Sequence, residues 1–155
     1  MKKQLFFFLL STIVLAIGCK QKTNSDADTT KAKPAPAIAA DGVYCYKYQV
    51  GKDITTVNLV LDGDTVTGEM NWLPYEKDSG RGTLQGTRSG NEISAVWAYM
   101  IEGSNQTEEV LFKMEGDQLL RKTGELVDAN YDGNLKMKDP ATAQYTETYT
   151  KVVCP

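Results

Sequence analysis

The sequence predicts an all-β protein, in which an antiparallel meander closes into a barrel of roughly eight strands after a signal peptide and a disordered linker. Two observations support this. Short β-prone runs follow one another from residue 43 onward, and nearly all are separated by turn residues such as Asp62-Gly63-Asp64. Within several runs apolar residues alternate with polar ones, which indicates strands with one face in a core.

Most neighbouring runs are joined by short turns, so each run is expected to pair with the next. The strands are expected over residues 43–50, 54–61, 65–73, 82–88, 93–101, 107–114, 118–127, 135–138 and 145–154.

Two of these runs carry a distinctive apolar pattern. In residues 93–101 one face is an apolar stripe and the opposite face is also rather apolar, which predicts the most buried strand. In the first run Tyr44, Tyr46 and Tyr48 share one face, where packing is favoured over binding.

The chain begins with a segment typical of secreted proteins. Two lysines precede an apolar run over residues 5–17, which is too short to cross roughly 30 Å of hydrocarbon. A basic start, a short apolar run and a small residue before the cut are typical of a signal peptide. Such a peptide is expected over residues 1–18.

Residues 15–19, Leu-Ala-Ile-Gly-Cys, resemble the lipobox of bacterial lipoproteins, although Ala16 stands where leucine is usual. The resemblance implies cleavage after Gly18 and a palmitate-bearing lipid anchor on Cys19 that binds the membrane. Lys20 follows the cysteine, which in the lipoprotein sorting scheme favours the outer membrane of the cell envelope. An ordinary signal peptide that ends at a cysteine is the alternative.

The lipidated cysteine and a flexible linker are expected over residues 19–40. After the cysteine this stretch has no aromatic residue and only Ile38 as a large aliphatic one, so it buries too little apolar surface to fold. Pro34 and Pro36 favour extended backbone. Residues 41–155 then form one domain with a single core.

Composition excludes several function classes. The formal net charge is −3 and no basic stripe is present, which argues against a nucleic-acid partner. The chain has no histidine, so a Ser-His-Asp or Cys-His site and a histidine-ligated zinc site cannot form within it. A carboxylate pair, as in a hydrolase, is the catalytic alternative that remains, but accidental pairs are expected among 20 acidic residues. No catalytic residue is predicted, and the protein is expected not to be an enzyme.

The remaining cysteines predict how the barrel closes. With Cys19 lipidated, Cys45 and Cys154 stand near the two ends of the domain. An exported chain matures in an oxidising compartment, so a disulfide between them is expected. Two free thiols are the alternative, but the pair forms no C-x-x-C motif. The disulfide would place the first and last strands side by side.

The pattern over residues 42–154 is similar to the calycin group, that is lipocalin- and avidin-like barrels, and to small-barrel lipoproteins of the Bacteroidetes type. The lipocalin G-x-W signature is absent, and Gly42-Val43-Tyr44 matches it only loosely. The resemblance implies a barrel that holds either side chains or one small ligand.

One loop matches the spacing of an EF-hand calcium site. Its oxygen-bearing residues are Asp128, Asn130, Asp132, Asn134 and Asp139. A proline follows at once where an exiting helix should run, so a plain hairpin turn is favoured over Ca²⁺. No other cofactor is expected.

The weak ligand-binding candidates are aromatic. Trp72 and Tyr75 flank a long charged loop, and Trp97 and Tyr99 lie in the middle of a strand. Aromatic residues are frequent at recognition sites, but ordinary core packing is the alternative for each.

Together these features predict a lipid-anchored, non-catalytic envelope lipoprotein whose barrel binds a small ligand or a protein partner. The alternative is a structural, interaction or inhibitor module with a filled core and no ligand pocket. A hollow barrel and a filled one share the same alternation, so both hypotheses stay open.

Overall fold

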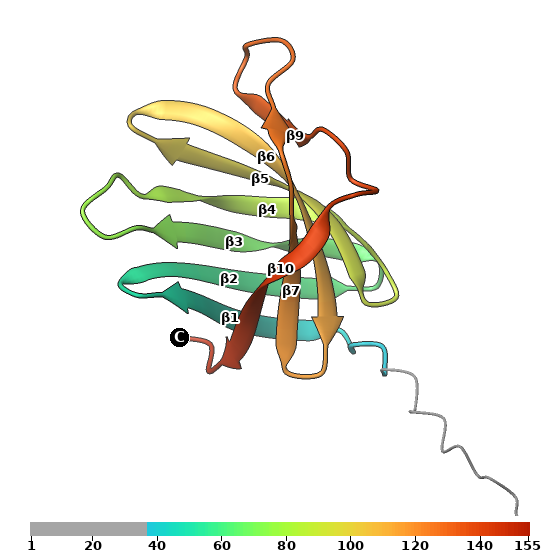
Figure 1. Cartoon of the computed structure of the whole chain (residues 1–155). Helices are drawn as coiled ribbons and strands as arrows, with labels where there is room; N and C mark the ends of the chain where they lie inside the picture. The colour runs from blue at the N-terminus through green and yellow to red at the C-terminus, as the bar shows by residue number, and fades with distance from the viewer. Residues whose placement is uncertain (1–36) are drawn as a thin grey trace, which may run out of the picture. The chain divides into compact units, whose positions relative to one another are not determined.

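Eight strands close into an antiparallel barrel in the computed structural model, which describes residues 37–155 (Figure 1). No helix occurs among these residues. The strands of the wall are β1 (Gly42–Val50), β2 (Asp53–Asp62), β3 (Thr65–Leu73), β4 (Gly80–Ser89), β5 (Glu92–Ile101), β6 (Ser104–Glu115), β7 (Gln118–Thr123) and β10 (Gln144–Val152). The predicted eight-stranded barrel is confirmed.

The predicted meander holds from β1 to β7 and is then interrupted. The expected strand over residues 118–127 divides at Gly124 into β7 and the short strand β8 (Leu126–Val127). A Cβ at Gly124 would lie only 3.3 Å from the Met137 Cγ and 3.4 Å from the Ala143 Cβ, so the chain turns where it carries no side chain. The chain then forms β9 (Asn134–Met137) and returns as β10.

The strands β8 and β9 form an outer hairpin that lies outside the barrel wall (Figure 1). β9 pairs with β6 in parallel, through Thr107 with Asn134 and Glu108 with Leu135. The hairpin is thus held along the edge of β6 that β7 leaves free. This arrangement creates the surface clefts described below.

A short seam between β1 and β10 closes the barrel. Only three residue pairs join these strands, starting at Cys45 with Val152, whereas nine pairs join β1 to β2. A disulfide links Cys45 to Cys154 across this seam, with a Cα–Cα distance of 5.2 Å. The predicted disulfide and the predicted adjacency of the first and last strands are confirmed.

Side chains fill the interior, because the inward position of each strand carries a large apolar residue. Every wall strand contributes at least one side chain that is essentially inaccessible to solvent. These residues are Tyr46, Val57, Leu59, Val66, Met70, Leu84, Ile93, Val110, Phe112, Leu119 and Tyr149.

Strand β5 differs from the expectation that it is the most buried one. Its inward residues are buried, but Val96 and Met100 on the outer face are 46% and 56% exposed. The β8–β9 hairpin does not cover this face completely, so apolar groups remain at the surface.

The segment before β1 is fastened to one end of the barrel, here called the N-terminal end. The backbone N–H of Ala39 donates to the Asn91 Oδ1 at 2.9 Å, and Arg88 donates to the Ala39 carbonyl and to the Asp41 carboxylate, both at 2.6 Å. Ordered contacts therefore begin before the expected boundary at residue 41. Residues 1–36, with the expected signal peptide, Cys19 and most of the linker, lie outside the described part.

The opposite end of the barrel, here called the loop end, carries the turn at Lys52, residues 74–79 and the turn at Gly103. Within the described chain, no helix is long and apolar enough to cross a membrane.

Candidate functional site

Trp97 and Tyr99 lie on the inner face of β5 and belong to the packing of the interior. Their rings stack with centroids 3.8 Å apart, and the Trp97 Nε1 donates to the Met70 carbonyl at 2.9 Å. Gly80 gives them room, since a Cβ there would lie 3.0 Å from the Trp97 Cη2.

The other two aromatic candidates are divided between the core and the surface. Trp72 is partly buried and packs against the core, and it pairs with Gly80 in the register. Tyr75 is exposed in the loop after β3, where the Lys52 Nζ lies 3.7 Å from its ring centre. The structure therefore gathers Trp72, Trp97 and Tyr99 around Gly80 and leaves Tyr75 outside.

The loop with EF-hand spacing is organised by its own backbone. The Asp128 carboxylate accepts the N–H groups of Asp132 and Gly133 at 3.1 and 2.9 Å. The Asp132 Oδ1 accepts the N–H of Asn134 at 3.1 Å. Hydrogen bonds from the Asn134 side chain and backbone, and from Asn130, hold the pKa of Asp132 below its usual range.

Asp139, the last expected calcium ligand, serves a separate turn, where its Oδ1 accepts the N–H of Ala141 at 3.1 Å. Among residues 37–155, no three acidic, histidine or cysteine side chains are arranged so that they could hold a metal ion. The calcium site remains a prediction from spacing.

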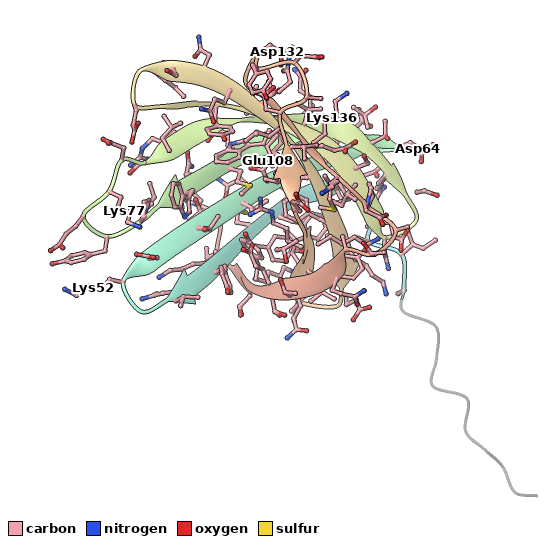
Figure 2. The ribbon with its side chains drawn as sticks, turned by 45° about the horizontal axis from the view of Figure 1, so that its top comes forward. Lys52, Asp64, Lys77, Glu108, Asp132 and Lys136 are labelled. Atoms are coloured by element: carbon pink, nitrogen blue, oxygen red, sulfur yellow. A yellow bond between two sulfur atoms is a disulfide. The ribbon has the colours of Figure 1, made fainter. Side chains whose placement is uncertain are left out.

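A charged cluster lies inside the barrel, where β6 and β7 separate after the Phe112–Arg121 pair. The Arg121 Nη2 contacts the Glu108 Oε1 at 2.5 Å, and its Nη1 contacts the Glu147 Oε2 at 3.3 Å. The Tyr149 hydroxyl donates to the same Glu147 oxygen at 2.7 Å. The Glu108 side chain is only 9% exposed, and Figure 2 places it near the middle of the barrel.

Electrostatics keeps Arg121 charged. Burial alone would lower the pKa of Arg121, but Glu108, Tyr149 and Glu147 raise it overall, so the guanidinium stays charged. Burial raises the pKa of Tyr149. Because the ion pairs join β6, β7 and β10, the cluster ties the wall together where the β6–β7 pairing ends.

Sequence reasoning did not identify this cluster, although a signal was present. Glu108 falls on the same face of its strand as Val110, Phe112 and Met114, which is the face predicted to be buried. A carboxylate on a buried face requires a cationic partner, and Arg121 follows on the next strand.

Two clefts on the outside of the wall flank the pairing of β6 with β9, and both are lined by Thr107 and Asn134. The first, here called the polar cleft, has a volume of about 440 Å³. It is lined by Arg81, Ala98, Tyr99, Met100, Asn105, Gln106, Thr107, Asp132, Gly133 and Asn134. The second, here called the apolar cleft, has a volume of about 540 Å³ and is lined by Val96, Thr107, Glu109, Val127, Ala129, Asn130, Asn134, Leu135 and Lys136.

An internal hydrogen bond fixes one amide side chain of the polar cleft, since the Thr107 hydroxyl donates to the Asn134 Oδ1 at 2.5 Å. On the inner side of the wall the Tyr99 hydroxyl donates to the Gln106 Oε1 at 2.8 Å, within the influence of Glu108 and Arg121. Tyr131, in the loop beside the cleft, is 94% exposed. The clefts thus combine fixed polar groups with exposed apolar ones, which is the make-up of a recognition site.

Comparison with known proteins identifies no relative of this chain. No protein-family model matches it, and no curated protein and no solved structure matches it either.

Proposed function

We propose that the chain is an envelope lipoprotein, held by lipid on Cys19, whose barrel is a non-catalytic binding module. Its recognition surface is the pair of clefts on the outer wall beside the β8–β9 hairpin. The binding partner is a small ligand or a segment of another envelope protein.

One observation carries this proposal: the interior is filled by side chains while the outer wall is hollowed. All eight wall strands contribute essentially inaccessible residues to the interior. The two clefts outside have volumes of about 440 and 540 Å³, which are within the usual range of ligand pockets. Val96 at the apolar cleft and Met100 at the polar cleft are exposed and supply apolar contact area.

The position of the chain ends supports the expected anchoring. The described chain enters the barrel at Ala37, at the N-terminal end, where Asn91 donates to the Ala37 carbonyl at 2.9 Å. A tether that begins at a lipidated Cys19 would join the barrel there. The loop end and the β8–β9 hairpin would then remain free for a partner.

The filled interior also favours a second candidate, an interaction or inhibitor module with no small ligand. In this case the apolar cleft would receive a side chain of a partner protein. Photo-crosslinking in cells separates a protein partner from a small ligand, because a crosslinker at Val96 would form one defined protein adduct only if a protein occupies the cleft. The same crosslinker at Val43, which is exposed elsewhere on the barrel, is the control.

The test of the module is native against denaturing mass spectrometry. The exported Cys19→Ser chain keeps the linker and the barrel but lacks the attachment site for lipid. A non-covalent mass that is lost on denaturation would support a binding module. A bare chain without crosslinks at Val96, or turnover of a substrate by the purified chain, would contradict it. The anchor is tested separately by comparing membrane fractions. The wild-type chain should be found in the membrane fraction, and the Cys19→Ser chain should be lost from it.

A further inference from the structure

We propose that the barrel rests with its N-terminal end against the surface of a lipid bilayer, and that a patch of exposed valines makes this contact. The patch, here called the seam patch, adjoins the seam between β1 and β10. Its members are between 41% and 93% exposed, and they are Val43, Val60, Val152 and Val153. This inference rests on the proposed function, because the lipid on Cys19 brings the barrel to the bilayer.

Two valines of the seam patch are cross-strand neighbours. Val43 on β1 pairs with Val60 on β2. Val60 is exposed between two buried residues of β2, so its side chain points out of the barrel, and the side chain of Val43 points the same way. The outer face of β1 and β2 therefore carries adjacent branched apolar groups close to the N-terminal end.

The end of the chain extends the patch across the seam. Val152 pairs with Cys45, which lies two residues after Val43 and so on the same face of β1. The disulfide to Cys154 fixes the end of the chain there, and Figure 1 shows the C-terminus beside β1. Val153 is thus held next to this face. A contiguous exposed apolar patch is typical of a contact with a membrane or a protein.

The entry point of the chain favours the bilayer as the occupant. The chain enters the barrel at Ala37, which Asn91 holds at the N-terminal end, and the next residue, Ile38, is exposed as well. Ala37 is 18 residues after Cys19, so even a fully extended chain spans at most roughly 65 Å between them. Such a tether keeps the local concentration of the barrel at the bilayer high, so that a weak apolar contact is enough.

The charges near the patch favour a bilayer without net charge. Asp62 and Asp64 are exposed in the turn that follows Val60, and they would repel an anionic surface. At the same end Arg88 is paired with a carboxylate, and so is Lys151. The contact should therefore be apolar, with zwitterionic lipid, and should not depend on attraction to anionic headgroups.

The test uses vesicles of phosphatidylcholine, a zwitterionic lipid. The chain from Cys19 to Pro155 is coupled to a maleimide-bearing lipid through the Cys19 thiol, since the other two cysteines are bonded to each other. A diazirine-bearing residue replaces Val43, and denaturing mass spectrometry measures the fraction of chains with a covalent lipid adduct. The matched control replaces Val96, an exposed valine on β5, four strands along the wall from β1.

Adducts at position 43 should exceed those at position 96 by about tenfold, the effect of burying roughly one valine side chain. Val60→Asp places a carboxylate in the patch and should lower the yield at position 43 by about tenfold. Val153→Asp should lower it too, and it lies beyond the last strand, so it leaves the pairing intact. Val96→Asp should leave the yield unchanged, and neither anionic phosphatidylglycerol nor a change of salt should raise it.

Equal yields at positions 43 and 96, or an unchanged yield in both Val60→Asp and Val153→Asp, would overturn the inference. So would adducts that form only with anionic lipid, or a covalent dimer at position 43, which would make a second copy the occupant. Because Cys19 is coupled chemically, such a failure leaves the native anchor and the clefts untouched. Those fail separately, if the wild-type chain is missing from the membrane fraction or if the native complex and the Val96 crosslinks are both absent.

Discussion

Removal of the Cys45–Cys154 disulfide is expected to destabilise the barrel strongly. The bond spans 109 residues of sequence and reinforces the β1–β10 seam, which has only three residue pairs. For a loop of this length, the lost restriction of the unfolded chain corresponds to about 4–5 kcal/mol. Since a domain of this size is stable by about 5–15 kcal/mol, the change removes a large share of its stability.

The assay is urea and thermal unfolding of Cys45→Ala/Cys154→Ala beside the wild-type chain. Each kcal/mol corresponds to roughly 4 °C for a domain of this size, so the thermal midpoint should fall by roughly 15–20 °C. Val153→Ala is the matched control, because Val153 adjoins Cys154 but is 93% exposed and should contribute almost nothing.

The reasoning would be refuted if the double variant lost less than about 1 kcal/mol, a change within the range of ordinary point mutations. Such a result would mean that the three residue pairs and the interior packing hold the seam without the covalent bond. Wild-type chain treated with a reductant should reproduce the unfolding curve of the double variant, which separates the effect of the bond from that of the substitutions.

Three further changes test other parts of the account. Arg121→Met leaves Glu108 buried without its partner and should lower the free energy of unfolding in urea by about 3–5 kcal/mol. Adding Glu108→Gln should restore part of that stability, and an equal loss in the single and the double variant would contradict the ion pair. Burial raises the pKa of Tyr46 to about 12, so its contribution to stability is complete below pH 10 and decreases as the pH rises toward 12, because the unfolded tyrosine ionises first. Tyrosinate absorbance and the free energy of unfolding, both measured across this pH range, check this prediction. A Tyr46→Phe variant whose stability depends on pH in the same way as that of the wild-type chain would contradict it. Arg88→Ala should release the N-terminal segment, so that amide exchange at Ala39 accelerates while exchange in β5 does not.

Much of the fold could be predicted from local patterns. The alternation in residues 54–61 places Val57, Leu59 and Leu61 on one face, and that face is buried. Turn residues such as Gly63 and Gly116 stand where positive φ angles are needed, so they mark the hairpins correctly. The cysteine spacing predicted closure because a disulfide is a long-range constraint that is visible in the sequence.

The outer hairpin could not be predicted in the same way. The division at Gly124 depends on its packing against Met137 and Ala143, which are distant in sequence. The parallel pairing of β9 with β6 likewise depends on where the chain returns after leaving the wall. Local alternation carries no information about either contact.

The candidate site was missed for the same physical reason. Arg81 and Asn105 come from different strands, and the loop with Asp132 completes their cleft only through the hairpin. The sequence directed attention to Trp97 and Tyr99, since aromatic residues are frequent in binding sites, but these two pack inside. The free donors of the cleft are ordinary surface residues until the fold brings them together.

The most direct test of the central claim is where a bound molecule sits. We would record native mass spectra of the exported Cys19→Ser chain, of its Val96→Glu and Met100→Glu forms, which alter the outer clefts, and of its Trp97→Phe form, which alters the interior. The account predicts that a non-covalent mass on the parent chain persists in Trp97→Phe and is lost from at least one cleft variant. A mass that persists in both cleft variants and is lost in Trp97→Phe would contradict it, because the ligand would then lie inside the barrel.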